Sequence, residues 1–290
     1  MEKIKIVATH DCKFHSDEVF AIAILKKVYG EFEVIRTRDP DILKKADIRV
    51  DVGGAYNLET NDFDHHQNDF KETGESGIPY SSCGLIWKNF GRKLVNSEEA
   101  FKRITKRIIE FLDAQDTGVD YSLGNVQVYG LGQAIDSFYP SWKDEEDVNK
   151  QFEKAVDFAT IILDNEIRKS NDYKEGLEIV RNAIKENSNK GFIILGEVGL
   201  PKGQMVEETD LLYVVSRRPD GNWNSIAIRD KVDSFENRKD FPKEWAGLTH
   251  EDLEKVSGVK GAVFCHKNLF MCACKTKEGI IEMTKKAVEA

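Results

Sequence analysis

The segment IKIVATHDCKFHSDEVFAIAIL, residues 4–25, decides the fold class. Its first part, Ile4–Ala8, is a short apolar run that predicts a buried strand. Ser16 is a typical N-cap residue, and the apolar side chains from Val19 to Leu25 recur at helical spacing, so a helix is predicted to begin at Ser16. The segment Thr9–Ser16 is therefore a strand-to-helix loop, and it carries two histidines.

Two more strands are predicted downstream, at Phe32–Arg36 and at Ile48–Val52. Between them, Asp39 is a suitable N-cap, and the proline that follows it favours the first position of a helix. Gly53-Gly54 ends the third strand. Because strands that alternate with helices form βαβ units, we expect an α/β domain whose parallel sheet is flanked by helices.

From residue 81 onward, the apolar spacing becomes helical and predicts four helices, the last two from the stripes Phe152–Ile167 and Leu177–Ile184. The polar stretch 186–191 is rich in turn formers and is the predicted linker. Five strand patterns and a final helix follow, which is typical of a smaller α+β domain with a mixed sheet. We expect two domains, residues 1–186 with the α/β core and a helical extension, and residues 190–290.

The composition is that of a globular protein, with 40% hydrophobic and 32% charged residues. No apolar run approaches the ~18 residues of a membrane span, and the first residues lack a signal-peptide pattern. Five cysteines then indicate free thiols in a reducing compartment, so we expect a cytoplasmic protein that does not act at a membrane. The net charge of -9 argues against a broad basic face for long nucleic acid, although bound cations would offset part of it.

Clusters of His and Asp follow the predicted strands, at the sheet edge where ligands bind in open α/β folds. The clusters are His10–Asp17, Asp51, Asp64–His66 and Asp113–Asp116. Four of the six histidines lie in the first quarter of the chain, each near an aspartate. Mixed imidazole and carboxylate ligands suit Mn²⁺, Fe²⁺, Co²⁺ or Zn²⁺ better than Mg²⁺.

The number of these side chains exceeds what one tetrahedral ion needs. It suits two ions ~3.5–4 Å apart that share a bridging carboxylate. Such a pair activates a shared water and stabilises both the attacking and the leaving oxygen of a phosphoryl group, so phosphoester hydrolysis is predicted. A lone His or Asp at a strand end is more often a solvated loop residue, and the prediction therefore depends on the clusters jointly.

These motifs resemble the DHH phosphoesterase superfamily, and more closely its melanocyte-proliferating-gene (Myg) branch of metal-dependent hydrolases. The resemblance extends over essentially the whole chain. In the first half it is carried by Ala8–Asp11, Phe14-His15, Asp17-Glu18, Arg36–Pro40, Val50–Gly54, Phe63–Gln67, Ser81-Ser82 and Gly84–Ile86. In the second half it is carried by Tyr139-Pro140 with Trp142, Trp245–Leu248, Val256–Gly258 and Thr276–Gly279.

The resemblance implies an exonuclease that cleaves RNA or short oligonucleotides by two-metal in-line hydrolysis. Mn²⁺ is the expected ion, with Mg²⁺, Co²⁺, Fe²⁺ or Zn²⁺ as alternatives. One ion would be held by His10, His15 and Asp51, and the other by Asp17, Asp51, His65 and Asp116. The implied catalytic residues are Asp51 as the bridge, His66 beside the phosphate or leaving group, and Asp64 as the residue that orients the histidines. Neighbours in an extended segment point opposite ways, so the three residues Asp64–His66 are not expected to bind a single ion.

The sequence departs from the superfamily pattern at His15, at Cys12 and at the stretch 272–274. His15 stands where the superfamily at large has Asp, a change shared with the Myg branch that is expected to alter metal preference. Cys12 replaces a glycine. Cys272-Ala273-Cys274 stands where oligonucleotide-cleaving relatives have a glycine-rich stretch that ends in His, so substrate choice does not follow from the resemblance alone.

Basic residues provide the predicted contacts to substrate. Arg36 and Arg38 alternate at the end of the second strand and are expected to reach phosphates, with a pair of surface charges as the alternative reading. In the second domain the predicted substrate-binding residues are Arg229, Lys231, Arg238 and His266. They would face the metals across a cleft between the domains. A homodimer is compatible with the sequence.

The sequence leaves two other functions open. One is a pyrophosphatase or small-nucleotide phosphatase, but the Ser-Arg-Lys-Lys element of such enzymes has only Ser216–Pro219 as its nearest counterpart. The other is a metal-loaded binding module without turnover, against which the complete set of predicted ligands argues.

Overall fold

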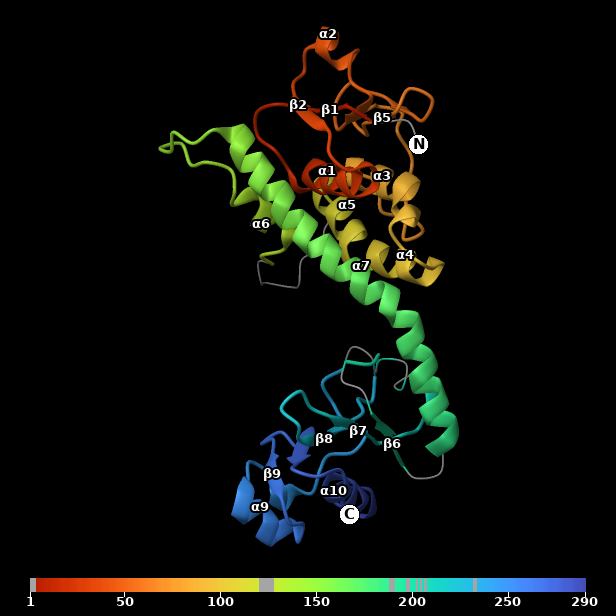
Figure 1. The fold of residues 1–290 in the computed structure, drawn as a ribbon, viewed down its shortest axis with the longest axis vertical. Helices are drawn as coiled ribbons and strands as arrows, with labels where there is room; N and C mark the ends of the chain where they lie inside the picture. The colour runs from red at the N-terminus through yellow and green to blue at the C-terminus, as the bar shows by residue number, and fades with distance from the viewer. Residues whose placement is uncertain are drawn as a thin grey trace. The chain divides into compact units, whose positions relative to one another are not determined.

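The computed structural model describes residues 4–119, 128–187, 191–196, 199–201, 203, 205, 208–231 and 234–290 (Figure 1). It divides into two compact units, Met1–Asp172 and Tyr173–Ala290. In the described part of the chain, no helix is both long enough and apolar enough to cross a membrane. All five cysteines are free thiols.

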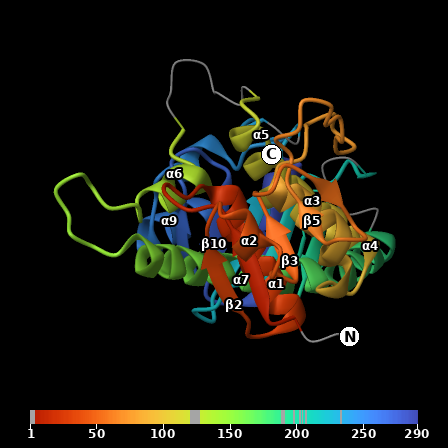
Figure 2. The same ribbon diagram turned by 90° about the horizontal axis from the view of Figure 1, so that it is seen from above.

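The first unit contains a five-stranded sheet of order β2-β1-β3-β5-β4, and Figure 2 shows β2, β3 and β5 side by side in this order. The strands are β1 (Ile6–Thr9), β2 (Glu33–Arg36), β3 (Ile48–Val50), β4 (Tyr56–Asn57) and β5 (Asp62–Phe63). The first four in spatial order are parallel, as predicted. The edge strand β4 pairs antiparallel with β5, which makes the sheet mixed.

Helices cover the two faces of this sheet unequally. They are α1 (Ser16–Tyr29), α2 (Pro40–Leu43), α3 (Ser82–Phe90), α4 (Glu98–Ile104), α5 (Glu110–Asp116) and α6 (Leu131–Asp136), with the single turns η1 (Gly91–Lys93) and η2 (Thr105–Ile109). Figure 1 shows α1, α3 and α5 on one side of the sheet and α2 on the other. The side with α1 holds the main hydrophobic core, so α1 is buried from Ser16 to Leu25. The predicted N-cap Asp39 accepts a hydrogen bond from the first turn of α2, and Ser97 does the same for α4. The N-cap of α1 is His15 and not the predicted Ser16.

One long helix, α7 (Val148–Asn187, 40 residues), replaces the two helices predicted from the stripes 152–167 and 177–184, so that prediction was wrong. The apolar stripe is interrupted because the two ends of α7 pack into different hydrophobic cores. Phe152, Val156 and Leu163 pack into the first unit's core, whereas Val180 packs against strands of the second unit. The contacts therefore divide the chain within α7, between residues 172 and 173. Residues 188–190 of the predicted linker lie outside the described residues.

The second unit contains another mixed sheet, of order β6-β7-β8-β10-β9. Its strands are β6 (Phe192–Leu195), β7 (Tyr213–Arg217), β8 (Trp223–Ala227), β9 (Ala262–Cys265) and β10 (Met271–Cys274). Only the β6–β7 pair is parallel among these strands. The described helices are η3 (Lys243–Trp245), α9 (His250–Ser257) and α10 (Lys277–Glu289). The predicted α+β character of this half is confirmed.

Candidate metal centre

The predicted metal ligands converge at the carboxyl edge of the first sheet. His10 follows β1, Asp51 follows β3, and the segment 64–66 follows β5. Because these strands are parallel, their carboxyl ends meet at one edge. Asp116 was predicted after a strand, but it is the last residue of the helix α5. The helix α5 reaches the same site from the face of the sheet that α1 covers (Figure 1).

Asp51 lies at the centre of the group. Its backbone has a φ of 54°, a left-handed conformation that turns the chain sharply after β3. Its Oδ2 lies 3.2 Å from His10 Nε2, and its Oδ1 lies 3.4 Å from His65 Nε2. Oδ1 also accepts a hydrogen bond of 3.0 Å from the Ser82 hydroxyl. Burial alone would raise the pKa of Asp51, but the hydrogen bonds from the two imidazoles hold it well below its usual range. Each carboxylate oxygen thus faces a different histidine.

His10 is buried and oriented by the loop that follows β1. Its Nδ1 lies 2.8 Å from the backbone carbonyl of Asp11, and its Nε2 lies 3.0 Å from Glu18 Oε1. Burial would lower the pKa of His10, but hydrogen bonds to Asp51 and Glu18 outweigh it and raise the value to about 10. Cys12 has a φ of 65°, the conformation that favours glycine, which matches the glycine expected there from the resemblance.

His65, Asp116 and Asp17 form the other side of the group. His65 Nε2 lies 3.0 Å from Asp116 Oδ2. Burial would lower the pKa of His65, but the carboxylates of Asp116 and Asp51 raise it to about 10. Asp17 is fully buried, and neither of its carboxylate oxygens has a hydrogen-bond partner among the described residues. Its burial, together with the charges of Asp51 and Asp116, raises its pKa well above the usual range.

Asp64 and His66 differ in exposure. Asp64 is buried and accepts hydrogen bonds from the Gly54 backbone at 2.7 Å and from His66 Nδ1 at 2.8 Å. The His66 side chain is 64% exposed. Sequence reasoning expected neighbouring side chains to point opposite ways, but the rings of His65 and His66 lie 4.3 Å apart and both face Asp51 Oδ1. The chain has left the strand conformation after Phe63, so the alternation of a strand does not apply.

These side chains fit divalent cations. Three groups present donor atoms within 4.8 Å of one another, and they are His10, His15, Glu18 and Asp51; Asp51, His65 and His66; and His15, Asp17 and Asp116. Asp51 and His15 each belong to two of the groups. The buried carboxylate of Asp17 without a donor is costly unless a cation binds it. All six predicted ligands therefore come together in the first unit.

A pocket of about 340 Å³ opens onto this group. It is lined by His10, His15, Arg38, Asp51, Val52, Gly53, Gly54, Asp64 and His66. Arg38 is exposed and lies 3.3 Å from the Asp11 carboxylate. Arg36 does not line the pocket. It donates to the Cys12 carbonyl at 2.7 Å and stacks over the Phe152 ring at 4.9 Å. Contact of either arginine with a substrate phosphate stays a prediction.

Three of the four predicted substrate-binding residues of the second unit have side-chain partners within that unit, namely Arg229, Arg238 and His266. The guanidinium of Arg229 lies 4.7 Å over the ring of Phe235, which is 89% exposed. Lys231 is exposed. Arg238 donates to the backbone carbonyls of Thr209 and Leu211, which makes it a structural residue. His266 Nδ1 accepts a hydrogen bond from the backbone of Asn268 at 3.1 Å.

Near the centre, Glu18 and Ser82 were missed as site residues, and Asp113 was named only as a member of a cluster without a role. Glu18 is buried against His10, and its position three residues after the N-cap His15 is the sequence signal that marks it. Ser82 binds Asp51. Asp113 is buried, and its Oδ1 accepts hydrogen bonds from the Ser81 backbone, the Ser81 hydroxyl and the Gly84 backbone. Burial is the main cause that raises the pKa of Asp113 to about 7.

Comparison with known proteins matches the whole chain to one family. Similar chains include "MYG1 protein" of Dictyostelium discoideum, which is 31% identical over 97% of this chain and 96% of the relative. "MYG1 exonuclease" of Homo sapiens is 29% identical over 96% of this chain and 84% of the relative. A crystal structure of an uncharacterized protein from Helicobacter pylori has 9% identity and a TM-score of 0.30, too low to support any conclusion. The model of the family MYG1_exonuc, described as "Uncharacterised protein family (UPF0160)", matches residues 6–288, and this chain therefore belongs to that family.

Proposed function

We propose that this protein is a divalent-metal-dependent exonuclease that cleaves RNA or short oligonucleotides. The observation that carries the proposal is the arrangement of Asp51, whose Oδ2 faces His10 and whose Oδ1 faces His65. A carboxylate with one oxygen toward each of two ligand groups suits a bridge between two ions. The relatives named exonucleases support the nucleic-acid substrate.

The chain offers ligands for two ions. In this proposal His10, His15 and Asp51 hold the first ion, and the second is held by Asp17, Asp51, His65 and Asp116. When bound, two such ions lower the pKa of a shared water and stabilise the charge that develops on the phosphoryl oxygens. Mn²⁺ is the ion we expect, because the donor set mixes imidazole with carboxylate.

Other side chains act on the substrate directly. His66 lines the pocket, and Asp64 binds its Nδ1, which leaves Nε2 to donate a proton to the leaving oxygen. Arg38 lines the same pocket and provides a cation for a phosphate oxygen. The pocket volume of about 340 Å³ lies at the small end of the range for ligand sites and suits a strand end.

The test uses the full chain, stripped of metal with a chelator and then supplied with Mn²⁺. End-labelled RNA and DNA oligomers, pyrophosphate and bis-phosphodiester nucleotides serve as substrates. The inactivating variant is Asp51→Asn, because asparagine tolerates the left-handed backbone of this position and removes only the charge. Asp41→Asn is the matched control, since the Asp41 side chain is 85% exposed.

We expect mononucleotides to be released from oligomers by the parent protein and by Asp41→Asn, but not by Asp51→Asn. Orthophosphate from pyrophosphate alone would instead support a pyrophosphatase. In the nearest counterpart of the pyrophosphatase element, Ser216 is buried against Asn224 and Arg218 pairs with Asp220, which weakens that alternative. Binding of Mn²⁺ without turnover of any substrate would support a binding module.

A further inference from the structure

We infer that Glu18 is an additional ligand of the metal ion at His10. Two histidines and two carboxylates would then bind this ion. The inference rests on the proposed metal centre and concerns a residue outside its predicted ligand set. Glu18 is fully buried, and its described partners are the backbone of His15 and the imidazole of His10. Neither partner is a permanent cation, and the guanidinium of Arg36, on which the charge of Glu18 acts, donates its hydrogen bonds to Asn149 and to the Cys12 carbonyl. The burial of this carboxylate therefore needs a further explanation.

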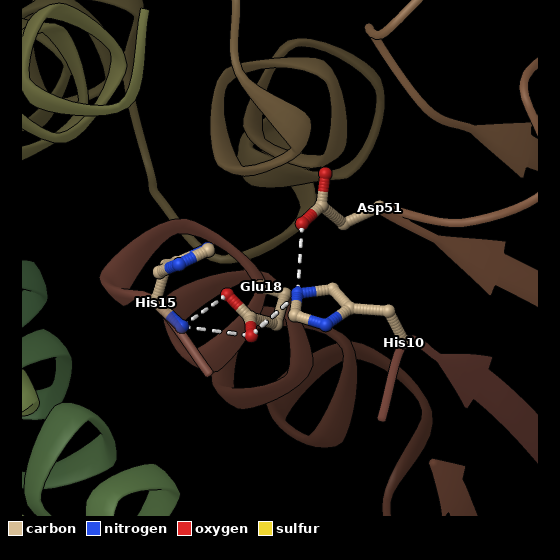
Figure 3. A group of neighbouring side chains, drawn as sticks. All are labelled: His10, His15, Glu18 and Asp51. Atoms are coloured by element: carbon tan, nitrogen blue, oxygen red, sulfur yellow. Dashed lines mark hydrogen bonds and ion pairs between the residues drawn. The ribbon is translucent and has the colours of Figure 1, made fainter. Parts of the chain in front are cut away.

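The first turn of α1 brings Glu18 to the site. His15 is the N-cap of the helix and Glu18 is its third residue, where a glutamate side chain folds back to the N-cap. Both Glu18 oxygens accept from the His15 backbone N–H, at 2.8 and 3.0 Å. Figure 3 shows the resulting position of the carboxylate, between His15 and the ring of His10, with Asp51 approaching the same ring nitrogen. The cap therefore holds the carboxylate without using all of its lone pairs.

The ring of His10 indicates where an ion would lie. A carbonyl oxygen can only accept, so the 2.8 Å contact between Nδ1 and the Asp11 carbonyl assigns a proton to Nδ1. This is the usual arrangement of a histidine whose other nitrogen binds a metal. Nε2 faces Glu18 Oε1 at 3.0 Å and Asp51 Oδ2 at 3.2 Å, and a single N–H cannot point at both. A cation between the three atoms would satisfy all of them.

The separations agree with coordination distances. Ligand atoms about 2.1 Å from an ion lie about 3.0 Å apart at right angles and about 3.4 Å apart at the tetrahedral angle. The contacts of His10 with Glu18 and Asp51 fall within this range. The donor atoms of His15 belong to the same group, all within 4.8 Å of one another.

The charge balance also favours this assignment. With Glu18 included, the centre has four carboxylate ligands, namely Asp17, Glu18, Asp51 and Asp116. Their four negative charges equal the positive charge of two divalent ions. Without Glu18 as a ligand, a buried negative charge would remain beside the ion but outside its coordination, which is costly in a site of low dielectric.

Manganese binding by Glu18→Gln tests the inference. Glutamine keeps an acceptor for the His15 N–H and removes the charged ligand, so a role as a helix cap alone would survive the change. The matched control is Glu254→Gln, since Glu254 also accepts from a backbone N–H, that of Gly261 at 2.7 Å, in the second unit. Mn²⁺ titrations by calorimetry and by electron paramagnetic resonance measure the affinity of each site.

We expect Glu18→Gln to weaken one of two Mn²⁺ sites by about 100-fold, since even the partners of metal ligands contribute about 10- to 100-fold to affinity. The Glu254→Gln control should bind like the parent. Unchanged affinity in Glu18→Gln would overturn the assignment while leaving the proposed function intact. Absence of Mn²⁺ binding by the parent protein would overturn both.

A second measurement does not depend on a folded variant. Crystals of the parent protein grown with Mn²⁺ would locate the ions by anomalous scattering. A Glu18 oxygen about 2.1 to 2.3 Å from an ion would establish the bond. A separation beyond about 3.5 Å, as in a contact mediated by water, would refute it.

Discussion

Gly84 is predicted to be a position where a single methyl group disturbs the metal centre. It lies in the first turn of α3, and its backbone N–H donates to Asp113 Oδ1 at 3.0 Å. A Cβ atom built at Gly84 would lie 2.5 Å from Asp113 Oδ1 and from Tyr80 Cδ1, and closer still to Asp113 Oδ2. No ordinary contact is that short, so Gly84→Ala must displace the Asp113 carboxylate or the helix.

The cost follows from what Asp113 binds. It accepts three hydrogen bonds from the start of α3, and their loss removes about 3 kcal/mol at about 1 kcal/mol each. Overpacking adds about 2 kcal/mol. Alanine returns about 1 kcal/mol through its higher helix propensity. We therefore expect the free energy of unfolding to fall by about 4 kcal/mol, a large part of the stability of a typical domain.

Metal binding should weaken as well. The helix α3 also carries Ser82, which donates to Asp51, and α5 carries Asp116 one turn beyond Asp113. Separation of α3 from α5 would therefore shift Asp116 relative to Asp51 and the hydroxyl that binds it. Urea denaturation followed by tryptophan fluorescence measures the stability, because Trp87 is buried in α3. Mn²⁺ titration measures the second effect.

Gly196→Ala is the control, because a Cβ at Gly196 would meet open space. It should change the free energy of unfolding by no more than about 0.5 kcal/mol. If Gly84→Ala were as stable as this control and bound Mn²⁺ normally, the close packing of Gly84 on Asp113 would not support the centre as described.

Three further predictions concern titration and turnover. His10 and His65 have pKa values of about 10 and carry protons at pH 7. Each ion that displaces one of these protons should bind about tenfold more tightly for each unit by which the pH rises between about pH 6 and 8. Calorimetry in buffers of different ionisation enthalpy counts the released protons, and zero release would contradict this. In the metal-free protein, burial raises the pKa of Asp113 to about 7. Between about pH 4 and 7 the folded state therefore holds a proton that the unfolded state has lost. The free energy of unfolding should fall by about 1.4 kcal/mol for each unit by which the pH rises in this range. Asp113→Asn should lack this slope in urea titrations at pH 4.5, 5.5 and 6.5, and an equal slope in both proteins would disprove the assignment. His66→Ala should keep the stability and both ions, because the side chain is 64% exposed, but should lower kcat by about 10²- to 10⁴-fold; a kcat equal to that of the parent would exclude proton donation by His66.

Much of the first unit was predictable because its signals are local. The strand-to-helix pattern of residues 4–25 and the N-cap Asp39 depend on neighbouring residues only, and the structure confirms them, although the N-cap of α1 is His15 and not Ser16. The long helix α7 was not predictable in the same way. Its apolar stripe is interrupted because two separate cores use different parts of it, and periodicity within one segment does not reveal which core it serves.

For the metal centre, too, the features that depend on local sequence differ from those that depend on long-range contacts. The sequence by itself determined that His10 and Asp51 follow parallel strands, because strand periodicity and strand ends are visible in the chain and parallel strands end at one edge. The two-residue strand β5 before His65 was not among the strands located in the sequence. The predicted distribution of ligands between two ions stays a prediction. The tertiary structure alone decided that Asp116 arrives from a helix, that Arg36 binds the Cys12 carbonyl while Arg38 lines the pocket, and that Glu18 is buried against His10. These three outcomes depend on contacts between residues distant along the chain or on the direction of a side chain, and neither is encoded in local spacing.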